Sequence, residues 1–116
     1  MSKLKPKDIR DEVRNVLEGT HIDTGGRGRS FLTAYQILER LPPAMRAQLI
    51  RERGTPGSGA GTYYAAASVV SDAAEMLKPY IEIRFLDTSL LKIMLENGTE
   101  IEPGNPNVGL YRLVDQ

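Results

Sequence analysis

Apolar positions recur with helical spacing over the first two thirds of the chain. In segment 6–19 they fall at i, i+4, i+7 and i+8, namely Ile9, Val13, Val16 and Leu17. This spacing forms one stripe of an amphipathic helix. Proline near its start and Gly19 at its end suit the two termini of such a helix. The segment "THIDTGGRGRS" (20–30) follows and has no periodicity, so it is expected to be a loop.

Two shorter helices are predicted next. Thr33 and Gln36 match a capping box, in which each side chain bonds the other residue's backbone amide, so a helix is expected over 33–41. The pair Pro42–Pro43 ends that helix and opens another over 43–53, because proline is tolerated at a first helical position.

The longest predicted helix, 62–78, follows the glycine-rich stretch "RGTPGSGAGTYYAAA" (53–67). Its apolar stripe contains Ala66, Val70, Ala73 and Leu77, and proline ends it at position 79. Ser71 and Glu75 are expected on its exposed face. Thr62 is the expected N-terminal cap, since threonine side chains accept hydrogen bonds from the first free amides of a helix.

After position 79 the hydrophobic period changes from about 3.6 residues to two. Segments 81–87 and 90–96 alternate apolar and polar residues and are predicted to pair as strands through a short turn at 87–89. Asn97–Gly98 predicts a further hairpin turn, and 108–114 a last strand. Phe85 is expected on the inward face with Ile81 and Ile83. The outward face would carry a second apolar surface of Leu86, Leu90 and Met94.

A run of helices followed by a run of strands predicts the α+β class. We expect four helices and then a small three- to four-stranded antiparallel sheet, with the helices covering one face. Because the chain has 116 residues, a single domain over 1–116 is expected.

The order of these elements resembles the winged helix-turn-helix class. "FLTAYQILERLP" (31–42) corresponds to the first helix of the turn, "GTYYAAASVVSDAAEML" (61–77) to the recognition helix and "IEIRFLDTSLLKIMLE" (81–96) to the wing. The helix over 43–53 departs from the simplest form of the class. The chain also resembles small stand-alone proteins of bacterial mobile elements and integron cassettes. The winged-helix resemblance implies DNA binding through helix 62–78.

The charges give only limited support to that implication. Residues 1–53 hold 11 basic against 7 acidic residues, a net charge of +4, and residues 54–116 hold 4 against 8, a net charge of −4. No Arg or Lys lies between Arg53 and Lys78. Phosphate neutralisation supplies much of the affinity for DNA, and Arg or Lys makes the commonest contact to guanine. A DNA surface would therefore need Arg27 and Arg29 together with Arg46, Arg51 and Arg53 on one face.

No catalytic, cofactor or metal site is predicted. The glycine-rich stretch lacks the lysine of a phosphate-binding Walker loop and does not follow a strand, as a dinucleotide fingerprint would. A weaker anion site at the start of helix 62–78, next to Arg51 and Arg53, stays open. His21 is the only histidine and there is no cysteine, which disfavours a zinc site. His21 is expected at the surface or at the edge of a strand.

Two functions stay open from the sequence. The first is a non-catalytic interaction or regulatory module that forms a homodimer or binds another protein. The alternative is a winged-helix DNA-binding transcriptional regulator. We expect no membrane segment, because no apolar run approaches the ~20 residues of a membrane span. We expect a cytoplasmic protein, because the absence of cysteine fits a reducing compartment. The residues expected to contact a partner or nucleic acid are Arg27, Arg29, Arg46, Arg51, Arg53, Thr62, Tyr63 and Tyr64.

Overall fold

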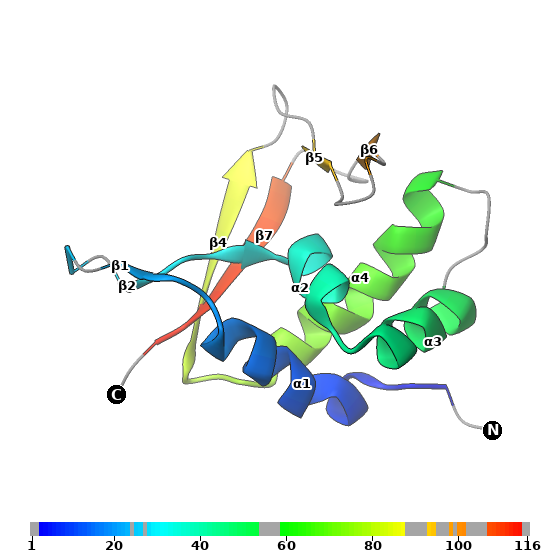
Figure 1. Ribbon diagram of the computed structural model, residues 1–116, viewed down its shortest axis with the longest axis horizontal. Coiled ribbons are helices and arrows are strands. Elements are labelled where there is room, and N and C mark those ends of the chain that lie inside the picture. The colour runs from blue at the N-terminus through cyan, green and yellow to red at the C-terminus, as the bar shows by residue number, and fades with distance from the viewer. Residues whose placement is uncertain are drawn as a thin grey trace.

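The computed structural model describes residues 3–23, 25–26, 28–53, 59–87, 93–94, 98, 100–101 and 107–114. Its helices are α1 (Pro6–Glu18), α2 (Ala34–Arg40), α3 (Pro43–Arg53) and α4 (Gly59–Glu75). Its strands are β1 (Ile22–Asp23), β2 (Gly28–Arg29), β3 (Leu32–Thr33), β4 (Ile81–Asp87), β5 (Ile93–Met94), β6 (Glu100–Ile101) and β7 (Asn107–Leu113). The predicted α+β class is confirmed, with the helices gathered beside the β4–β7 pair (Figure 1).

Helix α4 is the centre of the helical layer. It contacts α1, α2 and α3, and its predicted stripe is buried. Small side chains on this stripe let the neighbouring helices approach closely, and apolar burial of this kind is the main favourable term in folding. The buried apolar residues of the molecule are Ile9, Val13, Leu17, Leu32, Ala34, Tyr35, Ile37, Leu38, Leu41, Leu49, Ala66, Ala67, Val69, Val70, Ala73, Ala74, Leu77, Ile81, Val108 and Tyr111.

The start of α4 differs from the prediction. The helix begins at Gly59, three positions before Thr62, so Thr62 lies inside the helix and does not cap it. Glycine lowers helix stability by about 1 kcal/mol relative to alanine but does not forbid a helix, and an alanine-rich segment follows. Gly59 and Gly61 are therefore helical, while positions 54–58 of the predicted glycine loop lie outside the described residues.

The capping box of α2 is confirmed. The Gln36 backbone N–H donates to the Thr33 hydroxyl at 3.1 Å, and the Thr33 backbone N–H donates to the Gln36 side-chain oxygen at 2.9 Å. The prediction succeeds because the signal is local, since both partners lie within one turn of chain.

The main sheet is three-stranded and antiparallel in the order β3-β7-β4. β4 and β7 pair over seven residues, from Ile81↔Leu113 to Asp87↔Asn107. The predicted hairpin over 81–96 is therefore wrong, because β4 pairs with the last strand, and β5, the described part of segment 90–96, pairs with β6. Alternation predicts which face a residue occupies but not which strand pairs with it, and β5 offers a ladder of only two residues.

Two small hairpins complete the strands. Segment 20–30 is not simply a loop, because Ile22 pairs with Arg29 and Asp23 with Gly28. Gly26 and Gly28 have φ of 91° and 89°, a conformation that glycine adopts without a steric penalty. The same glycines that suggested a loop thus supply the turn of a hairpin.

The second small hairpin joins β5 and β6 around the predicted Asn97–Gly98 turn. Met94 pairs with Glu100, which leaves the five residues 95–99 between them. Asn97 lies outside the described residues, so the two-residue turn stays a prediction. The φ of 87° at Gly98 agrees with a turn at this place.

Candidate functional site

Strand β4 forms an edge of the main sheet. Among the described residues it pairs only with β7. The Val114 amide donates to the Tyr80 carbonyl at 2.9 Å, so the even-numbered residues of β4 direct their backbone groups towards β7. The backbone groups of Ile81, Ile83 and Phe85 therefore point away from the sheet. We call this side of β4, which pairs with no described strand, the open edge; the Ile83 carbonyl on it accepts a hydrogen bond from Arg84 Nη1 at 3.4 Å.

Exposed apolar side chains accompany the open edge. Phe85 is 74% exposed, although its alternation predicted an inward, covered position beside Ile81 and Ile83. That prediction is wrong because the helices cover only the first part of the strand: Ile81 is 8% exposed and Ile83 is half-buried. Leu86 is 39% exposed and Tyr80, directly before β4, is 47% exposed.

The predicted apolar surface of Leu86, Leu90 and Met94 does not form one hairpin face. Leu86 lies on β4, whereas Met94, 59% exposed, lies on β5 in a separate two-stranded sheet. Leu90 lies outside the described residues. The exposed apolar side chains are therefore divided between the two faces of β4 and the separate sheet that carries Met94.

Towards the other edge of the sheet, where β3 lies, contacts of Arg112 on the central strand β7 hold the first hairpin, and Arg112 also contacts Glu82 of β4. Arg112 donates through Nε to Glu82 Oε1 at 2.7 Å, and its Nη2 lies 2.6 Å from the same oxygen. Its Nη1 donates to the Arg29 carbonyl at 3.2 Å, and its guanidinium carbon lies 4.5 Å from the centroid of the Phe31 ring. We call this arrangement the closed side. It joins the first hairpin to the main sheet.

On the helix-facing surface of the sheet, Tyr111 joins β7 to α4. Its hydroxyl donates to Ser71 Oγ at 3.0 Å. Burial raises the pKa of Tyr111, because the charged phenolate is less well solvated there. The prediction that Ser71 faces outward is wrong, since it faces the sheet. Gly109 makes room for the Tyr111 ring, because a Cβ there would lie 2.6 Å from the Tyr111 hydroxyl.

The structure separates two of the predicted basic residues. Arg29 donates from Nη1 to the Glu18 carbonyl at the C-terminal end of α1, at 2.9 Å. Arg53 donates to the Leu4 carbonyl, just before the N-terminal end of the same helix. The 13 residues of α1 span about 20 Å. Figure 1 likewise shows the first hairpin and α3 at opposite ends of the molecule.

The other predicted basic residues differ in their surroundings. Arg46 donates to the Glu39 carbonyl at 2.8 Å, and its Nη1 lies 3.7 Å from the Glu39 carboxylate. Arg51 is exposed on α3. Arg27 lies outside the described residues. Arg29, Arg46 and Arg53 thus contact their own chain.

Thr62, Tyr63 and Tyr64 lie in the first part of α4. Their backbone is helical, and their side chains lie outside what the structure describes. Farther along α4, the exposed positions include Ser68, Asp72 and Glu75. The exposed stripe that is described is therefore acidic.

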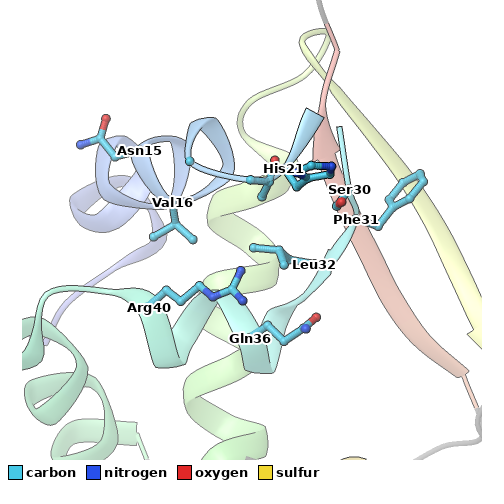
Figure 2. A pocket seen from close by; sticks show the side chains of 10 residues that line it. Asn15, Val16, His21, Ser30, Phe31, Leu32, Gln36 and Arg40 are labelled. Carbon is cyan, nitrogen blue, oxygen red and sulfur yellow. The ribbon is translucent and has the colours of Figure 1, made fainter. Parts of the chain in front are cut away.

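A pocket of about 560 Å³ lies between α1, α2 and the end of the first hairpin (Figure 2). Val16 and Leu32 provide apolar surface, Arg40 extends from α2 towards them, and Asn15 points away. The Gln36 side-chain oxygen is engaged in the helix cap. A specific small-molecule site needs several polar groups that converge on the ligand; Figure 2 shows Arg40 extending towards the apolar residues, and Thr20, His21 and Ser30 also line the pocket.

His21 lies at this pocket and is exposed, as predicted. Within the described part of the chain, no group of three or more His, Cys, Asp or Glu side chains is placed to hold a metal ion. In the same part, none of the helices combines the length and the apolar character that crossing a bilayer requires.

Comparison with known protein families, with curated protein sequences and with solved structures gives no match to this chain. The resemblances to winged-helix proteins and to proteins of mobile elements therefore stay predictions.

Sequence reasoning missed the open edge and the Arg112 contacts. Arg112 alternates with Tyr111 in the last strand, which shows that they occupy opposite faces. No local signal shows that Glu82 and Phe31, distant in sequence, lie beside Arg112. The exposure of Phe85 depends on where the helical cover ends, which no pattern within β4 encodes.

Proposed function

We propose that this chain is a non-catalytic interaction module that associates with a second copy of itself. The observation that carries the proposal is Phe85, a large apolar side chain that is 74% exposed on an unpaired edge strand. Tyr80 and Leu86, on the opposite face of the sheet from Phe85, add exposed apolar side chains near the two ends of the same strand. Exposed apolar side chains are candidate contacts for a partner, and a strand edge that pairs with no other strand is a template for pairing with another chain.

The charges support a protein partner over a nucleic acid. The described exposed stripe of α4 carries Asp72 and Glu75, which phosphates would repel. Arg29 and Arg53 lie at opposite ends of α1 and already hold carbonyl groups of their own chain. A basic footprint on one face is the usual mark of a nucleic-acid-binding domain.

Self-association is tested by measuring molar mass over a wide dilution series with light scattering. The chain of 12.8 kDa is expected to move from dimer to monomer as it is diluted. Phe85→Ser should weaken dimerisation about 100-fold, because each symmetric dimer would lose two buried phenyl groups.

A matched control is Ile22→Ser, which removes another exposed apolar side chain, 53% exposed, on the first hairpin. It should leave the dimerisation constant unchanged. A mass of one chain at every concentration, or an equal loss in both variants, would contradict the proposal.

The alternative function, DNA binding by a winged-helix regulator, rests on the order of helices followed by the sheet. It predicts binding to random duplex DNA at low salt and a steep loss of affinity as salt rises. The proposed module binds no duplex even at low salt. For either function the proposed location is the cytoplasm.

A further inference from the structure

We infer that two copies join through antiparallel pairing of their β4 open edges, with the two-fold axis passing beside Ile83. This inference rests on the proposed self-association and specifies its geometry. The main sheet would continue across the axis as a six-stranded sheet in the order β3-β7-β4-β4-β7-β3.

The backbone of the open edge permits this pairing. Ile81, Ile83 and Phe85 direct their N–H and C=O groups away from β7, as the bond from the Val114 amide to the Tyr80 carbonyl establishes. In antiparallel pairing, these are the groups that would exchange hydrogen bonds with a second strand. With the axis at Ile83, Ile83 pairs with its own copy and Ile81 pairs with Phe85 of the second copy.

The charges select this register. Glu82 and Arg84 lie on the same face of β4, with Arg84 Nη2 at 2.6 Å from Glu82 Oε2. An axis at Ile83 places Glu82 opposite Arg84 of the second copy, twice per dimer. An axis at Glu82 or at Arg84 would place like charges directly opposite each other, which is destabilising.

The apolar residues select the same register. Tyr80 and Leu86, at the two ends of the strand, become cross-strand neighbours between copies. On the helix-facing side, Phe85 comes beside Ile81 of the second copy, at the part of that sheet which its helices cover. The two-fold axis thus brings the exposed end of each β4 strand beside the covered end of the β4 strand in the other copy, as a self-complementary interface requires.

β4 lacks two of the devices that protect sheet edges, proline and a bulge, although it carries charged side chains at Glu82, Arg84 and Asp87. It contains no proline and no glycine, and it pairs without interruption over seven residues. Natural proteins commonly protect such edges with proline, bulges or charges pointing inward. The other edge strand, β3, has only two residues and offers a much shorter ladder.

Cysteine cross-linking tests the register, because the natural chain has no cysteine. Ile83→Cys should form a covalent dimer under mild oxidation, since paired positions across the axis lie about 5.5 Å apart, within disulfide range. Arg84→Cys is the matched control. It should form little covalent dimer, because the two introduced thiols would be offset by two residues, about 7 Å, along the strands.

Arg84→Glu gives a second test that needs no disulfide. It replaces two Glu–Arg contacts per dimer by two Glu–Glu contacts and should weaken dimerisation about 10-fold. Arg51→Glu makes the same change of charge on α3 and should leave dimerisation unchanged. Thermal unfolding of each variant verifies that the monomer is folded.

The possible outcomes separate the two proposals. If the natural chain stays monomeric at all concentrations, both the interaction proposal and this geometry fail. If it dimerises but Arg84→Cys cross-links at least as efficiently as Ile83→Cys, the register is wrong while self-association stands. Cross-linking of Ile83→Cys alone, together with weakening by Arg84→Glu, supports the register.

Discussion

The two sides of the small sheet differ in how far the rest of the chain covers them. On the closed side, Arg112 stacks on Phe31 and donates to the Arg29 carbonyl of the first hairpin, and Leu32 is 4% exposed. On the open edge, Phe85 is 74% exposed and the backbone faces no strand of its own chain among the described residues. The closed side is completed within one chain, whereas the open edge is completed in our account by a second copy.

The largest expected effect is on the free energy of unfolding, and it distinguishes a buried apolar side chain from an exposed one. Leu32→Ala should lower the free energy of unfolding by about 3 kcal/mol, because it leaves a cavity in the core. Phe85→Ala should lower it by less than ~0.5 kcal/mol in the monomer, since the side chain is already exposed. Urea denaturation at concentrations where the chain is monomeric measures both. Equal losses of unfolding free energy in the two variants would contradict the difference between the closed side and the open edge.

The next effect compares the two arginines that contact Glu82. Arg112→Gln should lower the free energy of unfolding by about 2 kcal/mol, because a half-buried ion pair and the stacking on Phe31 are lost. Arg84→Gln should change it by less than ~0.5 kcal/mol, since its side chain is 65% exposed. The same denaturation experiment measures both variants. A larger loss of unfolding free energy in Arg84→Gln than in Arg112→Gln would contradict this expectation.

A smaller effect concerns the contact between Tyr111 and α4. Tyr111→Phe should cost about 1 kcal/mol at neutral pH, because Ser71 loses its hydrogen-bond partner. Burial raises the pKa of Tyr111 above its ordinary value of 10.0, so the neutral phenol is favoured in the folded chain. Its contribution is therefore complete below pH 10 and is lost as the pH rises through the folded-state pKa.

Denaturation measured across alkaline pH tests this linkage. The natural chain should lose stability more steeply above pH 10 than Tyr111→Phe does. Parallel curves for the two proteins would show that Tyr111 titrates alike in the folded and unfolded chains.

The features predictable from the sequence are those with local signals. The capping box of Thr33 and Gln36 lies within one helical turn, and the stripe of α4 is set by the period of a single helix. The alternation in β4 correctly placed Ile81 and Ile83 on one face. Each of these follows from residues close together in the chain.

The features that could not be predicted depend on distant segments. The pairing of β4 with β7 crosses about 20 intervening residues, and neither strand carries a signal for its partner. Phe85 continues the alternation of Ile81 and Ile83, yet the helical cover ends before it. Ser71 faces the sheet because Tyr111 reaches it from the last strand. The candidate surface itself, an open edge, exists only once the strand order is known.

Amide hydrogen exchange of the natural chain tests the pairing of the open edges most directly. The amides of Glu82 and Arg84 face β7 and should be protected at every protein concentration. The amides of Ile83 and Phe85 should be protected only at concentrations where the dimer forms, and should exchange rapidly after dilution. Rapid exchange of Ile83 and Phe85 in a solution that light scattering shows to be dimeric would contradict the account.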